Sequence, residues 1–105
     1  MTDKRIVLTT CGSDVDAERI ARTLVERRLA ACVNIIGGVR SIYRWKDAVE
    51  DDAELLLVIK TQTSAIEALK TALAETHPYD VPELVVIQIE DGAAAYLSWI
   101  ASNVD

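Results

Sequence analysis

Two kinds of hydrophobic pattern alternate along this 105-residue chain, and their order leaves few folds open. Runs rich in β-branched residues, typical of strands, alternate with stretches whose apolar residues recur every three or four positions, as on one face of a helix. Strands are predicted at residues 5–11, 31–46, 53–61 and 84–89, and helices at 17–28, 66–73 and 96–100. This β-α-β-β-α-β order with an extra C-terminal helix predicts an α+β, ferredoxin-like fold, with helices on one face of an antiparallel sheet. The length fits a single domain spanning residues 1–105.

Three local features refine this prediction. Gly37 and Gly38 interrupt the second strand and predict a bulge or sharp bend within it. The polar stretch 46–52 predicts a connection between the second and third strands, and its acidic cluster with Glu54 is either a hard-cation site or, more simply, a solvated loop. Ser64 and Glu67 have the spacing of a capping box at the start of the second helix.

The long second and third strands predict an oligomer. Residues 55–58 are four consecutive branched apolar residues, which suits a strand that is covered on both faces. The predicted helices cover only one face of the sheet, and exposed strands of this kind aggregate unless they are paired. We therefore expect association between copies of the chain through sheet faces or strand edges.

Charge limits the classes of partner. The formal net charge is −6, so the surface repels phosphate backbones and anionic lipid and is compatible with cations. The predicted first and third strands carry no aromatic residues, whereas RNA-recognition domains of the same element order stack bases there. Neither nucleic acid nor a membrane is an expected partner.

The cysteines and the N-terminal sequence favour the cytoplasm. Cys11 and Cys32 are too few for a disulfide framework, and a reducing compartment is the simpler interpretation. No apolar stretch approaches the length of a membrane span, and no export signal is recognisable. Cys32 lies in an apolar strand and is interpreted as a small core residue.

The segment THPYDVPE, residues 76–83, contains the only histidine and both prolines. His77 precedes Pro78 and follows the second helix, so it has two open interpretations: a helix-end residue that bonds the last carbonyls, or a metal ligand. With a thiolate, or with Asp80 or Glu83, it would suit copper or another borderline cation. One histidine and two cysteines cannot form a closed zinc site.

Cys11 also has two open interpretations. It ends the first strand beside a predicted helix N-terminus, where the pKa of a thiol is lowered, so it is either a packing residue or a reactive or metal-contacting one. Nucleophilic catalysis finds no support, because the chain has neither a G-x-S-x-G motif nor a P-loop. Tyr43 and Trp45 are interpreted as packing residues under a helix or at a subunit contact.

Several short runs occur together in one characteristic order: LAACVN at 29–34, SIYRW at 41–45, ELLLVIKT at 54–61, HPY at 77–79, VPE at 81–83 and YLSW at 96–99. This combination covers nearly the whole chain and resembles the CutA family, the divalent-cation tolerance proteins. The resemblance implies a homotrimer assembled like the PII signalling proteins, with the long second and third strands paired between subunits. It also implies a cytosolic protein without enzymatic activity, linked to tolerance of copper, as Cu(II) or Cu(I), and of other divalent cations.

The same resemblance implies a metal site at the HPY motif, with His77 as its ligand. The family's strand cysteine aligns with Thr9 here, and Cys11 lies two residues further along the same face of the strand. Some relatives have a second histidine where this chain has Thr76.

Two function hypotheses follow. The first is a trimeric metal-binding protein whose ligands are His77, Cys11, Asp80 and Glu83. The second is a PII-like regulator or scaffold that holds a small molecule or a partner protein in clefts between subunits. A hydrolase of the acylphosphatase shape is disfavoured, because the early turn at residues 11–16 is acidic rather than a basic anion cradle.

Overall fold

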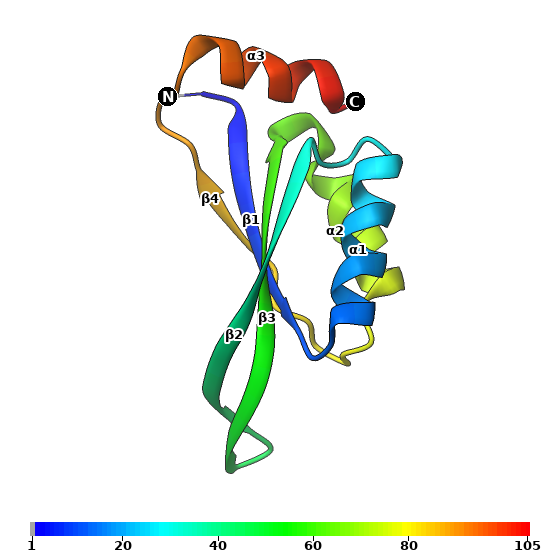
Figure 1. Ribbon diagram of the computed structural model, residues 1–105, viewed down its shortest axis with the longest axis vertical. Helices are drawn as coiled ribbons and strands as arrows, with labels where there is room; N and C mark the ends of the chain where they lie inside the picture. The colour runs from blue at the N-terminus through cyan, green and yellow to red at the C-terminus, as the bar shows by residue number, and fades with distance from the viewer. Residues whose placement is uncertain (1) are drawn as a thin grey trace.

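The computed structural model describes residues 2–105, and Met1, which the predicted domain includes, lies outside this range. The sheet has the order β2-β3-β1-β4, and all three neighbouring pairs are antiparallel. This confirms the predicted ferredoxin-like βαββαβ fold with an added C-terminal helix (Figure 1). The elements are β1 Lys4–Cys11, α1 Asp14–Glu26, β2 Cys32–Trp45, β3 Ala48–Gln62, a 3-10 turn Thr63–Ala65, α2 Ile66–Thr76, β4 Val85–Gln88 and α3 Ala94–Asn103.

The core lies between the sheet and the two helices α1 and α2, which cover one face of it (Figure 1). Alternate residues of β1 and β3 point into this layer, as the two-residue period of a strand requires. Val7, Leu57 and Ile59 are fully buried there against the apolar stripe of α1 and α2. The Ser13 hydroxyl caps α1 by accepting a hydrogen bond from the Asp16 amide at 3.1 Å.

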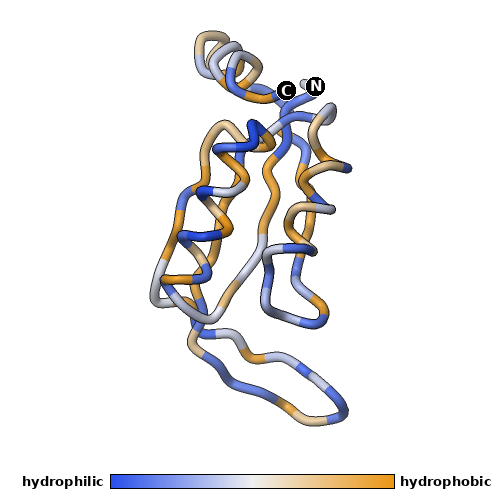
Figure 2. The backbone as a smooth tube through the Cα atoms, turned by 90° about the vertical axis from the view of Figure 1, so that its right-hand side faces the viewer, coloured by the Kyte–Doolittle hydropathy of each residue, from blue (hydrophilic) through white to orange (hydrophobic). Residues whose placement is uncertain are grey.

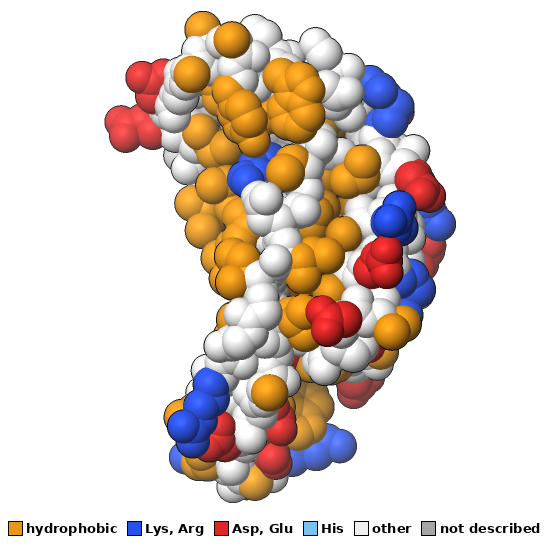
Figure 3. Space-filling model, viewed as in Figure 1, with side chains coloured by type: hydrophobic (Ala, Val, Ile, Leu, Met, Phe, Trp, Pro, Cys, Tyr) orange, Lys and Arg blue, Asp and Glu red, His pale blue; other side chains and the backbone are white. Residues whose placement is uncertain are grey.

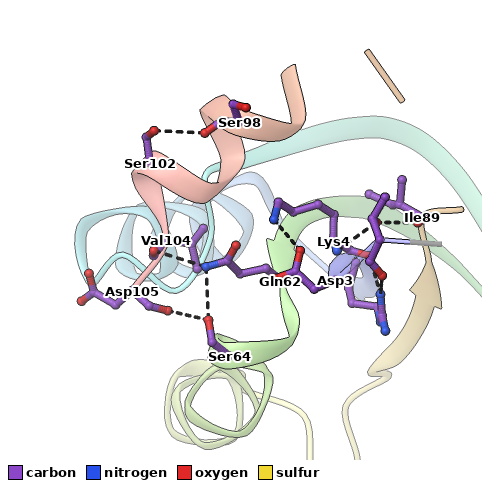
Figure 4. Close-up of polar contacts among 11 residues, drawn as sticks. Asp3, Lys4, Gln62, Ser64, Ile89, Ser98, Ser102, Val104 and Asp105 are labelled. Carbon is purple, nitrogen blue, oxygen red and sulfur yellow. Dashed lines mark hydrogen bonds and ion pairs between the residues drawn. The ribbon is translucent and has the colours of Figure 1, made fainter. Parts of the chain in front are cut away.

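The C-terminal helix α3 lies across the end of the sheet, where Ile100 and Val104 pack on Ala65. Its end is tied down by hydrogen bonds (Figure 4): the Ser64 hydroxyl donates to the Asp105 carbonyl at 2.9 Å, and the Gln62 amide to the Val104 carbonyl at 3.5 Å. The predicted capping box is therefore wrong. The Ser64 hydroxyl bonds the C-terminal segment, and α2 begins after a 3-10 turn without a side-chain cap.

The connection between β2 and β3 is much shorter than predicted. It is a two-residue turn, Lys46 and Asp47, both with positive φ, which is the geometry of a tight hairpin. Residues 48–52 are strand, not loop, so the predicted polar connection is wrong, although Asp51 and Asp52 are exposed, as expected of a solvated cluster. Cross-strand pairs hold the acidic side chains: Arg40 binds both carboxylate oxygens of Asp51, at 2.9 and 2.6 Å.

The predicted bend in β2 is confirmed. The pairing of β2 with β3 shifts register between Ile36 and Val39, and Gly38 has φ of 77°. Glycine adopts this left-handed conformation without steric cost, so the two glycines can form the irregularity within the ladder.

The hairpin gives the molecule an elongated shape. Its extents are 44 × 25 × 23 Å, and its radius of gyration is 14.2 Å, against about 13 Å for a compact domain of this length. Figures 1 and 2 show the far half of β2 and β3 projecting beyond the helices. A two-stranded hairpin is marginally stable by itself, so this projection needs further contacts.

The second face of the sheet is left open. Hydrophobic side chains gather over the middle of the molecule, whereas charged ones gather beside the helices and on the hairpin (Figure 3). Ile36, Val85 and Ile87 on this open face are 45–46% exposed. None of the helices within residues 2–105 is long and apolar enough to cross a membrane.

Candidate functional site

The segment that follows α2 turns a sharp corner at His77. The helix ends at Thr76, and the His77 amide makes the last helical hydrogen bond, to the Leu73 carbonyl at 2.8 Å. His77 itself is extended, with φ of −80° and ψ of 133°, because the following proline disfavours a helical conformation. The chain then runs from the helix layer to β4.

The imidazole of His77 is 6% exposed, and both of its nitrogens are engaged. Nε2 lies 2.7 Å from the Thr10 carbonyl, and Nδ1 lies 3.1 Å from the amide nitrogen of Tyr79. A carbonyl can only accept and an amide N–H can only donate, so the ring carries its proton on Nε2 and accepts at Nδ1. His77 thereby joins the end of α2 to the end of β1 and fixes the backbone of Tyr79.

Tyr79 carries this connection on to β3. Its ring lies 4.6 Å from the His77 ring, centroid to centroid, and its hydroxyl donates to Oε2 of Glu54 at 2.7 Å. Glu54 is 8% exposed, so the bond is made largely away from water. Burial, and secondarily the Glu54 carboxylate, raise the pKa of the Tyr79 phenol. A Cβ on Gly12 would lie 3.3 Å from the same hydroxyl, so the lack of a side chain there admits the tyrosine.

A hollow lies between the hairpin and residues 79–83. It consists of two adjoining parts of about 340 and 510 Å³ that share Tyr43, Trp45, Tyr79 and Val81. We call it the hairpin hollow. Its remaining lining residues are Thr10, Arg40, Ser41, Ile42, Lys46, Glu54, Asp80 and Glu83.

The tyrosines of this hollow are held by carboxylates. The Tyr43 hydroxyl donates to Oδ2 of Asp52 at 2.5 Å. That hydrogen bond, with the nearby negative charges, raises the pKa of Tyr43 to about 12. Tyr43 and Trp45 remain 41% and 39% exposed, so no helix covers them.

The predicted metal ligands lie in different surroundings. Cys11 is fully buried on the helix side of the sheet, with its sulfur 3.7 Å from the Ser13 carbonyl. Burial raises the pKa of its thiol, so the expectation of a lowered pKa at the helix N-terminus is wrong. Asp80 and Glu83 are exposed. No group of three His, Cys, Asp or Glu side chains within residues 2–105 is placed to hold a metal ion.

Thr9 is fully buried, and its hydroxyl has no hydrogen-bond partner within residues 2–105. The role of Glu54 was missed from sequence because it lies in a run of acidic residues typical of a loop. A signal was nevertheless present. Glu54 immediately precedes the apolar run of β3, where alternation places every second side chain on the face that carries the hollow.

The fold and the site define a ferredoxin-like α+β protein with an added C-terminal helix, an open apolar sheet face and a corner anchored by one buried histidine. Residues 5–103 match the family described as CutA1 divalent ion tolerance protein. The chain belongs to this family.

Individual relatives agree with this assignment. The divalent-cation tolerance protein CutA of Thermus thermophilus is 49% identical over 100 residues, which are 95% of this chain and 97% of that protein. The solved structure of the Thermus thermophilus protein superposes with a TM-score of 0.95 at 48% identity, covering 97% of this chain and 99% of the other. CutA from Xylella fastidiosa gives a TM-score of 0.96 at 39% identity, covering 99% and 100%. The chain spans about half the length of the mouse and human CutA proteins.

Proposed function

We propose that this protein binds divalent metal cations, copper among them, as a non-enzymatic homotrimer that contributes to cation tolerance. The observation that carries the proposal is the family match, which extends over residues 5–103. The net charge of −6 supports it, because the field of an acidic protein concentrates cations near its surface.

Two features of the fold support the homotrimer. The open sheet face exposes apolar side chains on β2 and β4, and the hairpin projects beyond the body that would stabilise it. Association that covers both at once would bury this surface and extend the sheet, as the family resemblance implies. Light scattering coupled to gel filtration tests the stoichiometry: a monomer at micromolar concentration would contradict the proposal.

The metal site is proposed at His77, with Asp80, Glu83 or Cys11 as further ligands. A metal that binds Nδ1 replaces the 3.1 Å hydrogen bond from the Tyr79 amide. A metal that binds Nε2 displaces the proton of this nitrogen and breaks its hydrogen bond to the Thr10 carbonyl. Since no three ligating side chains gather within residues 2–105, the remaining ligands would come from movement of residues 79–83 or from a neighbouring subunit.

Calorimetric titration of the untagged protein with Cu(II), Cu(I) and Zn(II) tests this site. We expect saturable binding that His77→Ala weakens at least tenfold and that Asp80→Asn combined with Glu83→Gln weakens less. Glu67→Gln on α2 is the matched control, because Glu67 is an exposed carboxylate that pairs with Lys70. Binding that is absent, or that His77→Ala leaves unchanged, would contradict the proposal.

We also propose that the protein resides in the cytoplasm, since Cys11 and Cys32 are both free thiols. Fractionation of cells that express the untagged chain tests this, and recovery in an exported fraction would contradict it.

A second candidate function is PII-like, with a small molecule bound beside the hairpin. The hairpin hollow favours it, because its volume lies in the range of small-molecule sites and its walls are aromatic. A thermal-shift screen of metabolites on the assembled protein tests it. The absence of any stabilising compound would remove this candidate.

A further inference from the structure

The hairpin hollow has a chemical character that the metal proposal does not explain. Three aromatic rings, those of Tyr43, Trp45 and Tyr79, line both of its parts. Aromatic rings are poor ligands for divalent metals, but their faces are electron-rich and attract organic cations. The question is therefore which ligand charge the polar groups around the rings prefer.

The phenol donors of the hollow are already used. Tyr43 donates to Asp52, and Tyr79 donates to Glu54. Neither phenol has an O–H left to offer an anionic ligand, so the tyrosines do not favour an anion. Glu54 and Glu83 both line the larger part and bring negative charge to it.

The two basic residues of the lining do not reverse the preference of the hollow for a cation. Arg40 is bound through two of its nitrogens to the carboxylate of Asp51. Lys46 lies with its ammonium 5.8 Å from the centroid of the Trp45 ring, within the distance of a cation–π contact. The chain thus places one of its own alkylammonium groups on the aromatic wall of the hollow.

We propose that the hairpin hollow binds a small organic ammonium ion, with the charged nitrogen over the Trp45 ring and the carboxylates of Glu54 and Glu83 supplying negative charge to the larger part of the hollow. The proposal deepens the second candidate function and rests on it. The ammonium of Lys46 lies over the same ring and competes with the ligand. His77 takes part only indirectly, because it fixes Tyr79, which forms one wall.

The test compares choline with its neutral isostere 3,3-dimethylbutan-1-ol, on the protein as it assembles in solution. Calorimetry and the fluorescence of Trp45, with Trp45→Leu as the blank for Trp99, report binding. We expect saturable binding of choline and roughly tenfold weaker binding of the isostere, which is the order of a partly desolvated cation–π contact. Equal binding of both compounds, or no binding of choline, overturns the proposal.

Three variants sharpen the result. Trp45→Leu is expected to weaken choline binding roughly tenfold. Lys46→Asn removes the competing ammonium while keeping a residue that tolerates positive φ, so it should strengthen choline binding a few-fold. Glu67→Gln, remote on α2, should change nothing. Choline binding that Lys46→Asn weakens would contradict the assigned position of the ligand.

The outcomes separate this inference from the functions on which it builds. Metal titrations of the same samples report on His77, and light scattering reports on assembly. If choline does not bind while another compound from the metabolite screen stabilises the protein, the proposed ammonium site is wrong and the second candidate function is retained. If no compound of the screen stabilises the protein while copper binds, only the metal-binding function is retained.

Discussion

At the residue scale, His77 acts as a structural joint. Its amide closes α2, its Nε2–H holds the end of β1, and its Nδ1 fixes Tyr79, whose hydroxyl then reaches Glu54 on β3. His77 and Tyr79 together therefore connect α2 with β1 and β3. A metal that binds this imidazole must break part of the joint, which couples occupancy of the proposed site to the position of Tyr79.

Two buried threonines predict opposite effects of the same substitution. Thr9 and Thr61 are both fully buried, but the Thr9 hydroxyl has no partner in the described part of the chain, whereas the Thr61 hydroxyl donates to the Leu29 carbonyl at 2.7 Å. Thr9→Val should raise the free energy of unfolding by about 1 kcal/mol, and Thr61→Val should lower it by about 1 kcal/mol or more. Urea unfolding at one fixed protein concentration measures both, and the same sign for the two variants would contradict the assignment.

The bond between Tyr43 and Asp52 predicts a dependence on alkaline pH. The pKa of Tyr43 is raised from 10.0 to about 12, so the folded protein favours the neutral phenol. The stability from this bond is complete below pH 10 and is lost as the pH rises through about 12. Tyrosinate absorbance should show one phenol titrating near pH 12 that Tyr43→Phe removes, and Asp52→Asn should lower that midpoint. An unchanged titration in Tyr43→Phe would refute it.

At the scale of elements, the β2–β3 hairpin is held by a turn that strains its own residues. Lys46 and Asp47 have φ of 50° and 64°, a region that costs non-glycine residues roughly 1–2 kcal/mol each. The hairpin tolerates this because a two-residue turn with positive φ matches the twist of its strands.

Replacing Asp47 by glycine should therefore stabilise the protein. Asp47→Gly relieves the positive φ and is expected to raise the free energy of unfolding by about 1 kcal/mol. Glu50→Gly, three residues along in β3, should instead lower it by about 0.5–1 kcal/mol, because glycine weakens a strand. Thermal melts of both variants at one protein concentration check the contrast, and a destabilised Asp47→Gly would count against it.

The elements also show what the sequence could predict. The spacing of apolar residues along the sequence predicted the order of strands and helices, because each element places its apolar residues on one face. It failed at residues 48–52, whose acidic side chains are typical of loops and are accepted in a strand through partners such as Arg40 and Tyr43. The segment 77–83 was predicted to follow the second helix. Its contacts with Gly12 and Glu54 were not predicted, because they depend on the sheet bringing distant segments together.

At the scale of the whole molecule, the open sheet face dominates the expected behaviour. Ile87 lies on this face and is 45% exposed in a single chain. Full burial of an exposed isoleucine side chain is worth about 1.5–3 kcal/mol, so covering the part of Ile87 that is still exposed would add roughly 1 kcal/mol per subunit. A chain whose stability depends on this face would unfold at a concentration-dependent temperature.

A charge placed on the open face should prevent assembly. Ile87→Lys is expected to shift the protein from the proposed trimer to monomers or to aggregates, because a lysine ammonium cannot be buried unpaired. Val15→Lys is the matched control, since Val15 is 73% exposed on α1, in the helix layer. Light scattering measures the mass of each variant, and an intact trimer in Ile87→Lys would show that the assembly uses another surface.

The edge strand β4 carries a last consequence. It is only four residues long, all four are exposed, and β1 is its one neighbour in the sheet. Backbone amides in such a strand open at low free energy, so within one chain β4 should exchange its amide hydrogens before the central strands do. Residues 77–84 lead directly into β4. Opening of β4 therefore also makes Tyr79, which lines the hairpin hollow, more mobile. Contact with a neighbouring subunit would slow the amide exchange of β4. The hairpin hollow would then be rigid because the subunits are assembled, not because of the single chain.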